Sequence, residues 1–436
     1  MATFNTTITG SNTGDTLIGT ESDQLILAGT GNDSIGSQYG GSSLYGNSGN
    51  DTFFANANAP GVGVGSTMEG AQGSDSFAFG TYGLTSVAVY GNEDNDTFNI
   101  EGDVSVSSLY GGQGDDSLRI ATTRVSGSRI ELNSGNDSFE LTGSLVNSFV
   151  HGGQGDDRFT ITGTVTGGTL AGGIGADLIN LKELASGAQI LLGSATDAAD
   201  GNDTLVANAN LASVSASGEL GDDSLSIARG ITGTTLTGGS GNDSVVVGIT
   251  AIDSSISGDN DNDFLSVSGG AAATTLSGGS GNDTVAVLNA LNVGQLLGNQ
   301  GDDSLSVGGT VIAGQVAGGS GNDQITIGAI TGGSAGGQLG ADTLVVNGNV
   351  SDALLDMTPS TNPDSPDDKA DVVSVNGTVS NSTVYSGTGD DSLYVTGAVS
   401  ASTVYGGSGN DTMNVTGSLG GLVDMADGAD SVTAAS

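Results

Sequence analysis

The segment Gly278–Val287 reads G-G-S-G-N-D-T-V-A-V and contains the unit that repeats along the chain. Its glycines, Asn282 and Asp283 predict a tight turn, and Val285 and Val287 alternate with small residues as in a strand. Close copies of the segment occur at 238–247 and 318–327, and partial copies at 111–120, 152–161 and 406–415. Internal repetition of this kind predicts a solenoid.

The turn aspartate gives the length of one repeat. Asp243, Asp263, Asp283 and Asp303 follow one another at intervals of 20 residues. One repeat is therefore one coil, and the chain has room for about 21 coils of about 20 residues each. We predict an all-β fold, a parallel β-solenoid that runs through residues 1–436 as a single continuous domain.

Apolar residues fall in four columns when positions are counted from the turn aspartate. For Asp283 these are Val285 at +2, Val287 at +4, Leu291 at +8 and Leu276 at −7. The spacing of two between +2 and +4 is that of a strand with one buried face. Positions +1 and +3 are mostly Ser or Thr and should face outward, and a second turn is rich in Gly and lacks acidic residues.

The charge of the chain points to a cationic partner. Its 49 Asp and Glu residues outnumber its 7 Lys and Arg residues, which gives a formal net charge of −42. Such a chain repels nucleic acid and anionic membranes, and it repels itself on folding. One divalent ion between each pair of adjacent coils would bring roughly +40 and nearly cancel this charge. No apolar run is long enough to predict a transmembrane segment.

Three longer gaps between turn aspartates predict insertions at the edge of the solenoid. They lie near residues 55–68, 194–201 and 352–370, and two of them contain proline. Proline and extra residues are tolerated at solenoid edges, so these segments are interpreted as loops.

The turn has the chemistry of a calcium site. Hard cations such as Ca²⁺ take six to eight oxygen ligands, often carboxylates together with backbone carbonyls. One G-G-x-G-N-D turn offers a carboxylate and several carbonyls, which is part of such a shell. The ion is therefore expected between the turns of successive coils, so that metal binding and coil stacking occur together.

The turn also resembles the G-G-x-G-x-D-x-U-x signature of the RTX, or hemolysin-type, calcium-binding repeats, and the resemblance covers nearly the whole chain. The usual β-roll has this nonapeptide twice per coil, whereas here it occurs once, as in the single-edged solenoid segments of RTX adhesins. The resemblance implies a row of multiple Ca²⁺ ions along one edge, about one per pair of adjacent coils. The carboxylate ligands that it implies are Asp33, Asp51, Asp75, Asp96, Asp116, Asp137, Asp157, Asp203, Asp223, Asp243, Asp263, Asp283, Asp303, Asp323, Asp391 and Asp411. The carbonyl ligands that it implies are those of Gly239, Gly241, Gly279, Gly281, Gly319 and Gly321. The turns at Asp177 and Asp342 read G-A-D and are left out of this set.

RTX proteins usually leave the cell by type I secretion with an uncleaved C-terminal signal. The tail 427–436, acidic and then small and hydroxylated, is compatible with such a signal. Because the repeat fills the chain, the main hypothesis is a secreted, calcium-dependent structural protein. It would lie outside the cell or at its surface and associate with itself into a filament, surface layer or matrix.

Two alternatives belong to other classes. One is an adhesin-like or ice-binding surface rod, although the regular threonine of G-T-G-N-D turns is mostly replaced by Ser or Gln, as at Ser240 and Gln300. The other is a non-catalytic module of a polysaccharide-active enzyme. We predict no catalytic residues and no enzymatic activity. The only histidine, His151, lies in a column with Tyr90 and Tyr110, and a ladder of stacked rings is the expected explanation.

Overall fold

The computed structural model describes residues 4–55, 64–358 and 368–435, and these residues form strands and no helix. Accordingly, no helix in these ranges could span a membrane. The chain divides into two compact units, residues 1–220 and 221–436. Each is described by itself below, and the prediction of one continuous domain stays a prediction.

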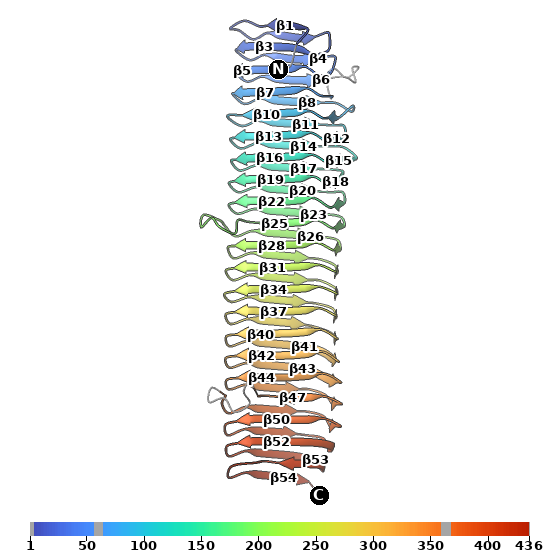
Figure 1. Cartoon of the computed structure of the whole chain (residues 1–436), viewed down its shortest axis with the longest axis vertical. Coiled ribbons are helices and arrows are strands. Elements are labelled where there is room, and N and C mark those ends of the chain that lie inside the picture. Colours follow the sequence, from blue (N-terminus) through green and yellow to red (C-terminus); the bar gives the residue numbers. More distant parts are fainter. Residues whose placement is uncertain (1–3, 56–63, 359–367, 436) are drawn as a thin grey trace. The chain divides into compact units, whose positions relative to one another are not determined.

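Unit 1 (residues 1–220) repeats three kinds of strand in each coil: a pre-turn strand before the turn aspartate, a post-turn strand after it, and a short strand (Figure 1). The pre-turn strands are β1 (Thr6–Thr9), β3 (Gln24–Thr30), β5 (Ser43–Ser48), β7 (Thr67–Gln72), β10 (Ala88–Asn92), β13 (Ser108–Gln113), β16 (Arg129–Ser134), β19 (Phe149–Gln154), β22 (Thr169–Ile174), β25 (Gln189–Leu191) and β28 (Ser215–Leu220). The post-turn strands are β2 (Thr16–Gly19), β4 (Ser34–Ser37), β6 (Thr52–Ala55), β8 (Ser76–Phe79), β11 (Thr97–Ile100), β14 (Ser117–Ile120), β17 (Ser138–Leu141), β20 (Arg158–Ile161), β23 (Leu178–Leu181) and β26 (Thr204–Ala207). The short strands are β9 (Leu84–Thr85), β12 (Val104–Ser105), β15 (Arg124–Ser126), β18 (Ser144–Val146), β21 (Val165–Thr166), β24 (Ala185–Ser186) and β27 (Leu211–Ala212).

Unit 2 (residues 221–436) has the same three kinds of strand, some of them joined. The pre-turn strands are β31 (Thr235–Ser240), β34 (Ser255–Asn260), β37 (Thr275–Ser280), β40 (Gln295–Gln300), β42 (Gln315–Ser320), β44 (Ser334–Leu339), β47 (Leu354–Asp356) and β50 (Thr383–Thr388). The post-turn strands are β29 (Ser224–Ile227), β32 (Ser244–Val247), β35 (Phe264–Val267), β38 (Thr284–Val287), β45 (Thr343–Val346), β48 (Val372–Val375), β51 (Ser392–Val395) and β54 (Ser431–Ala435). The short strands are β30 (Ile231–Thr232), β33 (Ala251–Ile252), β36 (Ala271–Ala272), β39 (Leu291–Asn292), β46 (Val350–Ser351) and β49 (Val379–Ser380). The joined strands are β41 (Ser304–Ile312), β43 (Gln324–Thr331), β52 (Val399–Ser408) and β53 (Thr412–Asp424).

Strands of one kind stack on their equivalents in the next coil, always in parallel. In unit 2, β35 pairs with β38 so that Leu265 lies beside Val285 and Val267 beside Val287. In unit 1, β13 pairs with β16 in the same manner. Each position of the repeat therefore becomes a column of neighbouring side chains, and the predicted parallel β-solenoid with coils of about 20 residues is confirmed.

The core of each unit consists of the four predicted apolar columns. Around Asp283, the side chains at +2, +4, +8 and −7 are all fully buried. Unit 1 places phenylalanine in the +2 column, where Phe77 stacks between Phe53 and Phe98 with ring centroids 4.7 Å apart on either side. Aliphatic and aromatic columns of this kind fill a narrow core with few residue types.

Each coil has one more bend than we expected. It follows the short strand at position −10, where residues such as Val106 (φ 50°) and Val293 (φ 52°) adopt left-handed backbone angles. After Val106, and at the same point in several other coils, the next residue is a buried Ser or Thr whose hydroxyl accepts a hydrogen bond from the preceding coil, as Ser128 Oγ does from Ser107 N at 3.2 Å. This small buried hydroxyl explains how a valine is held in an unfavourable conformation.

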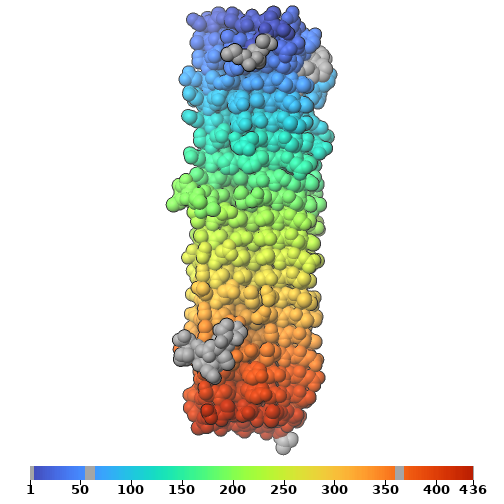
Figure 2. Space-filling model, in the orientation of Figure 1, coloured from blue at the N-terminus to red at the C-terminus, as the bar shows by residue number. Residues whose placement is uncertain are grey.

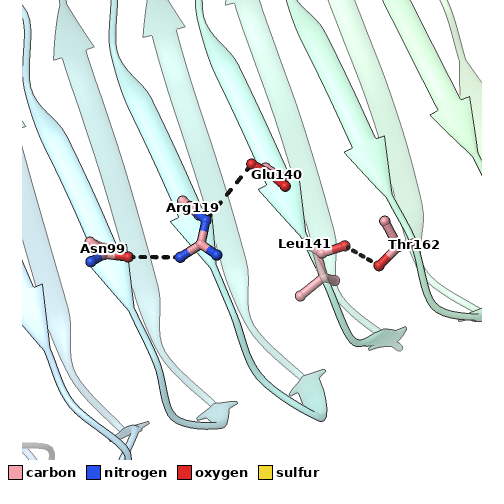
Figure 3. Close-up of polar contacts among 5 residues, drawn as sticks. All are labelled: Asn99, Arg119, Glu140, Leu141 and Thr162. Carbon is pink, nitrogen blue, oxygen red and sulfur yellow. Dashed lines mark hydrogen bonds and ion pairs between the residues drawn. The ribbon is translucent and has the colours of Figure 1, made fainter.

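The outward positions +1 and +3 carry polar side chains that interact from coil to coil. In unit 1, Arg119 on β14 donates to Asn99 Oδ1 on β11 at 3.3 Å and pairs with Glu140 on β17 at 3.9 Å (Figure 3). Further along, Thr162 Oγ1 donates to the carbonyl of Leu141 at 3.4 Å (Figure 3). The contacts of Arg119 are exposed, so they add little to stability.

Of the three predicted insertions, the segment 194–201 is the one described throughout. It lies between β25 and β26, its residues 195–199 are exposed, and it stands out from the side of unit 1 (Figure 2). The segments 55–68 and 352–370 fall partly outside the described residues, at 56–63 and 359–367.

Candidate metal centre

The turn aspartate begins each post-turn strand, after a glycine that brings adjacent coils close together. Gly281, two residues before Asp283, has φ +127°, which favours glycine. A Cβ atom there would lie 2.1 Å from the carbonyl oxygen of Asp261 in the preceding coil. A side chain at Gly281 would therefore clash with the backbone of the preceding coil.

One oxygen of each aspartate carboxylate is used in stacking the coils. Oδ1 of Asp283 accepts a hydrogen bond from the backbone N–H of Asp263 at 2.8 Å, and Oδ1 of Asp303 accepts one from Asp283 N at the same distance. In unit 1, Oδ1 of Asp116 accepts from Asp96 N at 2.7 Å. Every such bond runs from one coil to the aspartate of the next coil.

The other carboxylate oxygen, Oδ2, is buried and has no hydrogen-bond partner in most turns. Burying a carboxylate oxygen without a partner is unfavourable, so we expect each of these atoms to bind a proton or a cation. The aspartates in this state are Asp33, Asp51, Asp75, Asp96, Asp116, Asp137, Asp157, Asp177, Asp243, Asp263, Asp283, Asp303, Asp323, Asp342, Asp371, Asp391 and Asp411. We call these atoms the Oδ2 row.

A second glycine, at position −5, makes room for the Oδ2 row. A Cβ atom at Gly278 would lie 2.2 Å from Oδ2 of Asp283, and one at Gly298 would lie 2.1 Å from Oδ2 of Asp303. We did not assign a role to this glycine from the sequence. The signal was present as the first letter of G-G-x-G-N-D, but nothing in a single coil shows that the carboxylate folds back against it.

Burial raises the pKa of most of the aspartates in this row, and negative neighbours in adjacent coils raise it further in many of them. Burial raises the pKa of Asp303 to about 7, with contributions from Asp323 and Asp283. It raises the pKa of Asp96 to about 8 and that of Asp371 to about 9. Backbone N–H donors act in the opposite direction but do not compensate. A row of such groups needs positive charge if it is to be ionised at neutral pH.

A cation in this row would be bound by few carboxylates and several carbonyls. Within the described ranges, no group of three or more Asp, Glu, His or Cys side chains could hold a metal ion by itself. Each coil supplies one buried carboxylate, which leaves backbone oxygens for the rest of the shell. The stacked, buried aspartates fit calcium binding in this manner.

The aspartates predicted as ligands all occupy this one place in the coil and are only 1–3% exposed. Two of the turns left out of the prediction, those of Asp177 and Asp342, have the same environment. Oδ1 of Asp177 accepts from Asp157 N, and Oδ1 of Asp342 accepts from Asp323 N, both at 2.7 Å. The first turn differs, because Oδ2 of Asp15 accepts from Ser11 N at 2.6 Å.

The glycines predicted as carbonyl ligands lie at positions −4 and −2 of their turns. Their φ angles lie between +119° and +128°, where glycine is favoured. The assignment of individual ligands, both aspartate and glycine, stays a prediction.

Next to the Oδ2 row lies a second, exposed ladder that the sequence analysis did not recognise. Residues at position −1 are mostly Asn or Asp, and their Oδ1 atoms accept from the backbone of the following coil. Asn322 N donates to Asp302 Oδ1 at 2.6 Å, and Asp302 N donates to Asn282 Oδ1 at 2.8 Å. In this exposed ladder the backbone of the following coil donates to the preceding coil, whereas in the buried ladder the preceding coil donates to the following one. The exposed ladder therefore supports the turn from outside.

No family model matches the chain, and no curated protein matches it. Among solved structures, the chain is similar to the X-ray crystal structure of a hyperactive, Ca²⁺-dependent, β-helical antifreeze protein from an Antarctic bacterium. The two are 24% identical, the TM-score is 0.47, and the match covers 70% of this chain and 84% of that chain. This is a likeness of fold.

Proposed function

We propose that this chain is a calcium-dependent solenoid in which Ca²⁺ ions lie between successive turns and are bound by the Oδ2 row. The observation that supports this proposal is the buried Oδ2 atom without a partner, repeated in coil after coil. Glycines such as Gly279 and Gly281 would contribute carbonyl oxygens, and the cation would allow neighbouring aspartates to be ionised together.

The ions would couple folding to location. Where Ca²⁺ is scarce, the repulsion within an acidic row opposes folding, and where it is millimolar, binding to the folded state stabilises that state. The chain would therefore fold outside the cell or at its surface. This is consistent with secretion guided by residues 427–436, which stays a prediction.

The role that we propose is non-catalytic: a rigid surface rod that binds a ligand through its outer face. A hollow on the outer face of β16, β19, β22 and β25 in unit 1, described below, supports a binding role. Ice is not favoured by the turn column, in which Ser280, Gln300 and Ser320 alternate in register. Self-association into a filament or layer stays the alternative, as predicted from the sequence.

The first experiment is a calcium titration of the full chain, starting from chelated protein at pH 8 and followed by far-ultraviolet circular dichroism and calorimetry. Strand signal that appears with many bound ions per chain would support the proposal, and Mg²⁺ at the same concentration serves as the control. A fold that forms equally well in chelator and in Ca²⁺ would rule it out.

Electron microscopy and thermal hysteresis then separate the finer roles. Filaments or sheets that vanish on chelation would replace the binding rod with the structural alternative. Thermal hysteresis, the property expected of an antifreeze protein, would make ice the ligand.

A further inference from the structure

A hollow of about 570 Å³ lies on the outer face of the pre-turn strands in unit 1, across β16, β19, β22 and β25. A volume of this size is typical of small-molecule sites. The hollow is lined by Asn133, Ser134, His151, Gly153, Gln154, Ala171, Gly173, Ile174, Leu191, Gly193 and Ser194.

The hollow arises because the column at position −6 has only a small side chain at this level. Position −6 carries Tyr110 on β13 and His151 on β19, but Ala171 on β22, where only a methyl group is present. The next pre-turn strand, β25, ends at Leu191, and the chain then leaves through Gly193 into the loop 194–201. The small side chain of Ala171 therefore forms the floor of the hollow, and the imidazole ring of His151 and the loop 194–201 lie at its edges.

The ring that borders the hollow is fixed by its neighbours. We expected His151 to stack on tyrosines of its column, as Tyr90 and Tyr110 do at 4.9 Å. Instead, its ring stacks on Phe149 on the same strand at 5.9 Å, because its column neighbours are Glu131 and Ala171. The guanidinium of Arg129 lies 4.5 Å from the centroid of Phe149.

The lining is electrically neutral in a chain with a net charge of −42. None of the residues that line the hollow is Asp, Glu, Lys or Arg. Burial lowers the pKa of His151, which favours the neutral imidazole. The nearby charges of Arg129 and Glu131 form an ion pair with each other. The hollow therefore offers amides, hydroxyls and an uncharged ring beside an apolar floor.

We propose that this hollow binds a neutral saccharide. Sugar hydroxyls donate to and accept from amides such as those of Asn133 and Gln154. The carbon-bound hydrogens on one face of a sugar ring pack against apolar and aromatic surface, which Ala171, Leu191 and His151 provide. An anionic ligand would find no cation in the lining, and a cationic one no carboxylate. The inference deepens the proposed binding role by naming the class of ligand, and it rests on that role.

The test uses the full chain in 2 mM Ca²⁺, with maltotriose, cellotriose and chitotriose as neutral probes and trigalacturonic acid as the charged probe. Binding is measured by calorimetry and by saturation-transfer NMR. We expect at least one neutral trisaccharide to bind with a dissociation constant below about 1 mM and the acidic one to bind at least about tenfold more weakly.

Two matched substitutions locate the site. Ala171→Tyr fills the hollow with a ring that the same column already accepts at Tyr110, and it should weaken binding at least about tenfold. Thr237→Tyr is the control, since Thr237 on β31 occupies the same position of the repeat in unit 2 and does not line this hollow. It should change the affinity less than about twofold.

The inference is overturned if none of the neutral probes binds, if the acidic probe binds equally well, or if the two tyrosine variants behave alike. Circular dichroism of every sample with and without Ca²⁺ separates this result from the proposed calcium dependence. A chain that folds with Ca²⁺ but binds no sugar refutes only the inference, whereas one that is indifferent to Ca²⁺ refutes the proposed function.

Discussion

The substitution Asp303→Asn tests the Oδ2 row most directly, because its effect on stability should change sign with calcium. Asparagine keeps the Oδ1 acceptor that Asp283 N uses at 2.8 Å. It replaces the buried, unpartnered Oδ2 with an uncharged NH₂ group. Without metal the variant loses an unfavourable charge, and with metal it loses a ligand.

The size of the effect follows from the pKa. Burial raises the pKa of Asp303 from 3.8 to about 7, and about 1.4 kcal/mol per pKa unit gives about 4 kcal/mol as an upper bound at pH 8. Screening at the edge of the coil reduces this value to roughly 1–2 kcal/mol. In chelator, the variant should therefore be more stable than the parent by that amount. In millimolar Ca²⁺, it should be less stable by about 3 kcal/mol, because a buried cation loses its charged partner.

The control is Asp302→Asn, which removes the same charge from the same turn. Asp302 belongs to the exposed ladder, and asparagine already occupies this position in both neighbouring coils, at Asn282 and Asn322. Its effect should stay within about 0.5 kcal/mol in both conditions. Urea unfolding at pH 8, with and without Ca²⁺, measures all three proteins. If Asp303→Asn changes the stability of the chain equally in chelator and in Ca²⁺, the carboxylate does not bind calcium and the reasoning fails.

Three further predictions concern the same row and the core. Chelated protein should be more stable at pH 5 than at pH 8, because the pKa values of the buried aspartates are raised in the folded state. Their contribution to stability is complete below about pH 4 and is lost as the pH rises through about 6–8. Urea unfolding midpoints measured across this range check the prediction, and a midpoint that rises with pH would contradict it. Gly278→Ala places a methyl group against Asp283 Oδ2 and should lower the number of bound ions measured by calorimetry, whereas Gly80→Ala, where no atom lies within 4 Å, should leave it unchanged. Phe77→Ala removes the middle ring of the core stack and should lower the free energy of unfolding in urea by about 3–5 kcal/mol. Tyr82→Ala is the control, because this side chain is 58% exposed, and it should lower the free energy of unfolding by less than about 0.5 kcal/mol. Equal losses in the two variants would refute the packing argument.

The sequence predicts the fold of this chain well because its columns are periodic. The four apolar positions around Asp283, the outward hydroxyls and the parallel stacking all follow from a repeat of 20 residues with strand alternation. The third bend does not follow, because it depends on a left-handed residue such as Val293, which no propensity favours there. In several coils its signal was a Ser or Thr one position later, such as Ser107 after Val106, but Gly294 follows Val293.

The candidate site was predictable in position but not in mechanism. The turn aspartates were recognisable from spacing alone. This includes Asp177 and Asp342, whose turns differ in sequence from the motif but keep its position in the repeat. What a single sequence does not show is which carboxylate oxygen accepts the hydrogen bond from the preceding coil. That depends on contacts between residues 20 apart, whereas the glycine at position −5, as at Gly278, is favoured by a contact with the aspartate five residues later.

The uniform bonding of the turns makes the number of coils in the protein adjustable. From Asp243 to Asp323, four successive Oδ1 bonds to the preceding coil all measure 2.8 Å. Each coil in this stretch therefore presents the same donor and acceptor to its neighbours. Removing residues 264–283 would join Asp263 to Thr284 and restore the same contacts, whereas a deletion of ten residues would bring strands of different kinds together. Evolution and protein engineering can thus lengthen or shorten such a chain by duplicating or deleting whole coils.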